Sequence, residues 1–80
     1  MKIPVIRTLV EKYSLEELKN AENAIAEEQQ PEIEVEGEDE GEQLTHVYGA
    51  IWIKERIEND GVDPKVALRE FSARVRNSIS

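Results

Sequence analysis

The sequence predicts an all-α or nearly all-α fold. In it, three to four short helices pack around a central helix at residues 42–59, with a short extended acidic segment near residues 32–36. Apolar residues recur at spacings of three and four along most of the chain, which is the pattern of amphipathic helices. Residues typical of helix starts and stops separate these stretches. The length of 80 residues predicts a single small helical domain spanning residues 1–80.

Two short helices are predicted before the acidic segment. Pro4 suits a first helical turn, and the apolar residues that follow it share one helical face: Val5, Ile6, Leu9, Val10 and Tyr13. A short strand at residues 2–6 is the alternative. Ser14 and Glu17 match a capping box that begins a second helix. This helix runs to about Gln29, ahead of Pro31, with an apolar stripe of Leu15, Leu18, Ala21 and Ile25.

An acidic connector is predicted at about residues 30–41. Residues 27–42 hold nine acids and no Lys or Arg, whereas the rest of the chain holds nine acids against ten bases and is nearly neutral. Ile33 and Val35 alternate with glutamates, a period of two that suits a half-exposed strand. A lone strand of this length has no pairing partner in the chain.

The central helix is predicted to be covered on two sides, because it is apolar on two sides. One face carries Leu44, Val47, Tyr48, Ile51 and Trp52; the other carries Ala50, Ile53 and Ile57, with His46 among them. Gly61 is the expected left-handed stop. Asp63 and Pro64 begin the last helix as N-cap and first helical residue, and its inward residues are Ala67, Leu68, Phe71, Val75 and Ile79.

The net charge of −8 argues against nucleic acid and anionic membranes as partners, since both would repel the chain. No apolar run approaches the roughly 20 residues that span a bilayer, and Arg7 ends the first apolar run too early for a signal peptide. The absence of cysteine excludes disulfides and thiolate metal sites and fits a reducing compartment. We therefore expect a soluble, cytoplasmic protein.

His46 is the only histidine and the first candidate for acid–base chemistry. Glu42 precedes it by one helical turn, so an enzyme with a His46/Glu42 proton-transfer pair is one hypothesis. No serine lies in a nucleophile elbow, and a histidine on an apolar helix face is more often a partly buried structural residue. We therefore expect no catalytic residue.

The Glu-rich stretch suggests a second hypothesis, a divalent-cation-responsive protein. Its spacing does not match an EF-hand loop. A solvated, flexible connector is the simpler interpretation, and we expect no specific metal site and no cofactor.

Two further groups of residues are candidates for contact with partners. Lys65, Arg69 and Arg76 share one face of the last helix and would meet a phosphate, an acidic partner, the chain's own Glu-rich segment, or only solvent. Tyr48 and Trp52 lie four residues apart on the central helix. We expect them in the core, with an interface anchor as the alternative.

A family resemblance rests on the string Ile33-Glu34-Val35-Glu36-Gly37-Glu38-Asp39-Glu40-Gly41-Glu42-Gln43-Leu44-Thr45-His46 and on the start Met1-Lys2-Ile3-Pro4-Val5-Ile6. With these residues the whole chain resembles a family of small, acidic, uncharacterised bacterial proteins of unknown function. The resemblance implies a bacterial cytosolic setting and carries over no functional residue.

Together these observations favour a non-enzymatic interaction or accessory module that self-associates as a homodimer. Three features support self-association: a thin core without disulfides, a central helix apolar on two sides, and an unpaired strand at residues 32–36. A protein with a basic surface is a further possible partner.

Overall fold

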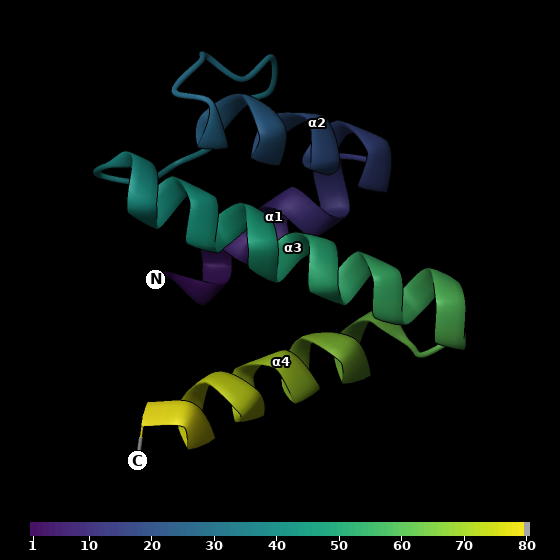
Figure 1. Ribbon diagram of the computed structural model, residues 1–80. Helices are drawn as coiled ribbons and strands as arrows, with labels where there is room; N and C mark the ends of the chain where they lie inside the picture. Colours follow the sequence, from purple (N-terminus) through teal and green to yellow (C-terminus); the bar gives the residue numbers. More distant parts are fainter. Residues whose placement is uncertain (80) are drawn as a thin grey trace.

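The computed structural model describes residues 1–79 and consists of four helices, with no strand among these residues (Figure 1). The helices are α1 (Ile3–Lys12), α2 (Leu15–Ala26), α3 (Glu40–Asp60) and α4 (Pro64–Ile79). The all-α prediction is confirmed.

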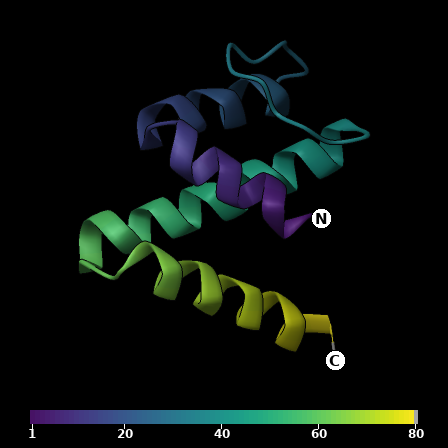
Figure 2. The same ribbon diagram turned by 180° about the vertical axis from the view of Figure 1, so that it is seen from behind.

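Helix α3 is the centre of the fold, as predicted. It packs against α1, α2 and α4. In Figure 1, α2 and α4 lie on opposite sides of α3 and α1 crosses behind it; Figure 2 shows α1 from the front. Because neighbours cover it on three sides, buried residues are spread around its circumference: His46, Val47, Gly49, Ala50, Ile51 and Ile53. These neighbours therefore cover parts of both apolar faces that the sequence predicts.

The helix ends follow the predicted signals. The Ser14 hydroxyl accepts from the Glu17 amide at 3.1 Å while the Glu17 carboxylate accepts from the Ser14 amide at 2.9 Å, which completes the capping box. Gly61 adopts the left-handed conformation (φ 66°) after α3, and the Asp63 carboxylate accepts from the Lys65 amide at the start of α4. Asp39 begins α3 two residues earlier than predicted by accepting from the Glu42 amide.

The strand alternative for residues 2–6 is wrong. Helix α1 begins at Ile3, and the Lys2 carbonyl accepts the amides of Val5 and Ile6. Pro4 fits this first turn because its missing N–H would have no helical acceptor there.

The strand-like interpretation of residues 32–36 needs correction. The chain between α2 and α3 is irregular, and the second helix ends at Ala26 rather than near Gln29. The alternation of exposure holds: Val35 is buried and Ile33 half-buried, whereas the glutamates between and beside them are exposed. Val35 packs into the helical core, and its carbonyl accepts from the Gln43 side chain at 3.2 Å. The alternation of apolar and acidic residues thus reflects which side chains face the core, although no β-sheet hydrogen bonds form here.

Candidate functional site

The His46 ring is fully buried and both of its nitrogens are hydrogen-bonded. Nε2 accepts from the Lys2 backbone amide at 3.0 Å, and Nδ1 lies 2.7 Å from the Glu36 carbonyl oxygen. These partners require the neutral tautomer with the proton on Nδ1, because a carbonyl can only accept and an amide can only donate. With both nitrogens hydrogen-bonded, the ring holds the chain before α1 and the middle of the acidic connector against α3.

Glu42 is engaged in contacts that do not involve the His46 ring. One carboxylate oxygen accepts from the Glu38 amide at 3.0 Å, and the other lies 3.7 Å from the N-terminal ammonium group. The hydrogen bond from Glu38 lowers the pKa of Glu42, and the nearby terminal ammonium acts in the same direction. Among the described residues, no hydrogen bond joins Glu42 to His46, so the two side chains are not arranged as a hydrogen-bonded pair.

The acidic connector presents its carboxylates to solvent. Glu32, Glu34, Glu36 and Glu38 are all exposed. Within residues 1–79, no group of three or more ligating side chains lies close enough together to hold a metal ion. That the connector has no specific affinity for cations stays a prediction.

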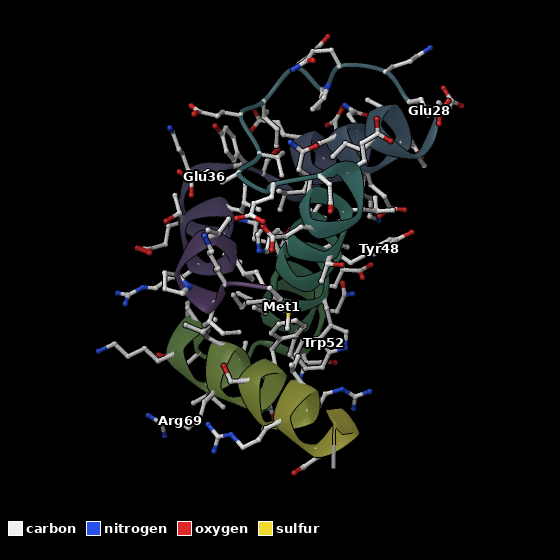
Figure 3. The ribbon with its side chains drawn as sticks, turned by 90° about the vertical axis from the view of Figure 1, so that its left-hand side faces the viewer. Met1, Glu28, Glu36, Tyr48, Trp52 and Arg69 are labelled. Atoms are coloured by element: carbon white, nitrogen blue, oxygen red, sulfur yellow. The ribbon has the colours of Figure 1, made fainter. Side chains whose placement is uncertain are left out.

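An exposed apolar surface lies where α3 and α4 meet the N-terminus. Tyr48 is 51% exposed and Met1 is 45% exposed, and both border a groove of about 830 Å³ together with Trp52, Phe71 and Arg74. Figure 3 shows Tyr48 and Trp52 on one flank of the molecule, with Met1 beside them. We call these five residues the aromatic surface. The expectation that Tyr48 belongs to the core is wrong, and Trp52 is only half-buried.

The aromatic surface depends on a close approach between α3 and α4. A β-carbon at Gly49 would stand 2.7 Å from the Phe71 ring, so only glycine leaves room for it. The Phe71 and Trp52 ring centroids lie 5.9 Å apart, and the Arg74 guanidinium stands 5.5 Å from the Trp52 ring centroid. The two ring planes are tilted by 45°, and close aromatic pairs and arginine over indole are both favourable contacts. Arg74 therefore covers one side of Trp52 and leaves Tyr48 uncovered.

The predicted basic stripe on α4 divides in the structure. Lys65 and Arg69 line a groove between α1 and α4, to which α1 contributes Arg7, whereas Arg76 does not line it. Within residues 1–79, no ion pair joins these bases to the Glu-rich connector, so the self-pairing alternative lacks support in the part of the chain that is described. Figure 3 shows Arg69 and Trp52 on opposite sides of α4. The aromatic surface and the basic groove are thus separate.

One ion pair between helices was not predicted from the sequence. The Arg56 guanidinium bonds both carboxylate oxygens of Glu70, at 2.9 and 3.1 Å, and also bonds Asp60 at 2.8 Å. These bonds raise the pKa of Arg56 and lower the pKa of Glu70. The spacing of Arg56 and Asp60 is visible in the sequence, but nothing local indicates that Glu70 faces Arg56 from another helix.

The geometry defines a small four-helix protein whose exposed features are an aromatic surface, a basic groove and an acidic connector. The chain belongs to the family of unknown function DUF6952, whose model matches residues 1–80. No curated protein and no solved structure matches the chain. No helix within residues 1–79 combines the length and the apolar character needed to cross a bilayer.

Proposed function

We propose that this protein is a non-enzymatic accessory module that acts by binding and self-associates through the aromatic surface. The observation that carries the proposal is Tyr48, a large side chain 51% exposed in the middle of the central helix. Around it lie Met1 and the half-covered Trp52. Exposed aromatic groups that adjoin one another are typical of interfaces. We place this activity in the cytoplasm, in keeping with the cysteine-free composition.

A second copy suits this surface because a two-fold axis brings the same patch together from both sides. Tyr48 of one protomer would then lie against Trp52 and Met1 of the other. The alternative pairing through residues 32–36 is disfavoured, because Val35 is already buried in its own fold and the exposed glutamates beside it would repel their copies. The dimer is therefore expected to form through helices.

Replacing Tyr48 with glutamate tests the proposal. Tyr48→Glu should abolish a dimer that the unchanged protein forms at tens of micromolar, because it places a charge in the middle of the interface. Analytical ultracentrifugation measures the masses, with 9.2 kDa expected for the monomer.

Val66→Glu is the matched control, since Val66 is also an apolar residue, 44% exposed, but lies outside the aromatic surface. It should leave the dimer intact. The proposed self-association would be refuted by a monomer in the unchanged protein, or by equal effects of Tyr48→Glu and Val66→Glu.

The acidic connector is the reason to propose a second binding partner, a protein with a basic surface. Its glutamates are exposed and lie together in one stretch of chain. Such a partner would bind at the end of the molecule that carries the connector, which Figure 1 shows above α3 and away from α4.

A further inference from the structure

We propose that the groove between α1 and α4 binds an acidic amphipathic helix of a partner protein. This site is independent of the aromatic surface, which lies on the other side of α4 (Figure 3). It would allow one copy of the chain to bind a partner while it also contacts a second copy.

The floor of the groove is apolar. It has a volume of about 510 Å³ and is lined by Ile3 and Val10 from α1, Ile53 from α3 and Leu68 from α4. Ile53 is buried, and the other three are half-buried side chains at the edge of the core. An amphipathic helix whose apolar stripe packs on this floor would bury these side chains fully.

The walls of the groove are basic, although the chain carries a net charge of −8. Arg7 and Glu11 lie on one wall and Lys65 and Arg69 on the other, so the lining carries three bases and one acid, and all four side chains are exposed. Arg7 pairs with Glu11 at 3.1 Å. Among residues 1–79, no carboxylate forms an ion pair within 4.0 Å with the side chain of Lys65 or Arg69, although the Asp63 carboxylate accepts from the Lys65 backbone amide. The groove therefore offers positive charge to an incoming anion, and charge complementarity favours an acidic partner.

The placement of these charges distinguishes an acidic helix from a small anionic amphiphile. A fatty-acid-like ligand needs its cations gathered at one end of an apolar cavity. Here cations lie on both walls. The residues that line the groove extend along about two turns of each helix, from Ile3 to Val10 in α1 and from Lys65 to Ser72 in α4. A helix with an apolar stripe and acidic residues on both flanks matches this arrangement.

The chain's own acidic connector does not match the groove as well. Its Val35 side chain is buried in the core of its own protomer. The connector of a second copy would have to release that side chain in order to place an apolar stripe in the groove. A separate partner is therefore the better occupant.

Fluorescence anisotropy with a synthetic peptide tests the proposal. The probe is a fluorescein-labelled helix of about 15 residues with leucines at i, i+3, i+4 and i+7 and glutamates on both flanks, which is the spacing of helix-in-groove anchors. We expect binding at low salt, and at least about tenfold weaker binding by the same peptide with glutamine in place of glutamate. Added salt should weaken binding of the glutamate peptide, because the charged walls are exposed.

Arg69→Glu and Arg76→Glu form the matched pair of variants. Both replace an exposed arginine of α4 and change the net charge equally, but only Arg69 lines the groove. Arg69→Glu should weaken peptide binding at least about tenfold, and Arg76→Glu should leave it within about twofold. Circular dichroism establishes that both variants keep the helical fold.

Backbone NMR shifts locate the bound peptide. Shifts centred on Val10 and Leu68 support the proposal, whereas shifts centred on Tyr48 and Trp52 overturn it. Equal weakening by Arg69→Glu and Arg76→Glu, or equal affinity for the glutamine peptide, overturns it as well. Binding of sodium decanoate in the groove without binding of the peptide would overturn it in favour of a small amphiphile.

Discussion

The buried imidazole of His46 holds two pieces of irregular chain against the central helix. The Lys2 amide and the Glu36 carbonyl both find their partner in this ring. An apolar residue of similar size at this position would leave both backbone groups without that partner, and unsatisfied buried groups are costly. These two hydrogen bonds thereby explain a single polar residue in an otherwise apolar helix face.

Replacing His46 separates the packing role from the hydrogen-bonding role. His46→Leu should lower the free energy of unfolding by about 2 kcal/mol, since a donor and an acceptor lose their partners. His46→Gln keeps one donor and one acceptor and should lower it by about 1 kcal/mol. Urea unfolding followed by circular dichroism measures both values.

The tautomer of the His46 ring provides an independent test of its hydrogen-bonding role. A long-range ¹H–¹⁵N spectrum of the neutral ring should show the proton on Nδ1, as the Glu36 carbonyl requires. A proton found on Nε2, or equal stability of the Leu and Gln variants, would contradict the hydrogen-bonding role.

Gly49 is the second residue whose identity the packing decides. A β-carbon there would stand 2.7 Å from the Phe71 ring and 2.9 Å from the Ile6 side chain. Gly49→Ala gains about 1 kcal/mol of helix propensity but overpacks two contacts, which costs about 1–3 kcal/mol. We expect a net loss of about 1 kcal/mol in the free energy of unfolding, measured with urea.

Gly41→Ala is the control, because it lies in the same helix and its β-carbon would only reach 3.4 Å from an Asp39 carboxylate oxygen. It should stabilise the fold slightly through helix propensity alone. If Gly49→Ala stabilised the protein as much as Gly41→Ala, the close approach of Phe71 and Ile6 to α3 would be disproved.

At the scale of the helices, the contact between α3 and α4 depends on pH through Glu70. The Arg56 guanidinium lowers the pKa of Glu70 from its usual value of 4.5. A carboxyl group with a lowered pKa in the folded state contributes stability above its unfolded pKa. That contribution is lost as the pH falls through the folded pKa.

Glu70→Gln should therefore be less stable than the unchanged protein at neutral pH, and the difference should vanish at pH values well below 4.5. Urea unfolding at a series of pH values measures this difference. Glu58→Gln removes an exposed carboxylate of α3 that lies outside this ion pair, and it should show a smaller effect at neutral pH. A constant difference for Glu70→Gln across the acidic range would count against the Arg56 pair.

The helices were predictable from the sequence because their signals are local. The Ser14 capping box, the Gly61 stop and the Asp63-Pro64 start each act within a few residues, and the structure has all three. The prediction of a strand at residues 32–36 was wrong, because the alternation of apolar and acidic residues indicates only which side chains face inward. That pattern does not require a sheet.

The candidate surfaces were less predictable, because they depend on how helices are placed relative to one another. Tyr48 and Trp52 share a helix face with buried residues, and the placement of the neighbouring helices leaves Tyr48 exposed. Likewise, Arg7 and Arg69 are 62 residues apart in the sequence and line one groove only because α1 and α4 flank α3. No local pattern in the sequence encodes either arrangement.

At the scale of the whole molecule, charge is divided between two ends. The acidic connector lies on one side of α3, and the basic groove adjoins α4 on the other (Figure 1). This division creates two ways for copies to meet. One is a symmetric contact through the aromatic surface. The other is a head-to-tail contact in which the connector of one copy lies on the groove of the next, and the burial of Val35 in its own protomer disfavours it.

Salt distinguishes these two contacts, because it affects them in opposite directions. Two chains that each carry a charge of −8 repel one another, and screening at about 0.1 M salt confines such repulsion to about 10 Å. A dimer held by the aromatic surface should therefore tighten several-fold between low and moderate salt, as measured by sedimentation equilibrium. A head-to-tail contact between acids and bases would weaken under the same change and would grow into longer assemblies. The Tyr48→Glu variant should remain monomeric at both salt concentrations, since screening the net charge does not restore the aromatic contact that it removes.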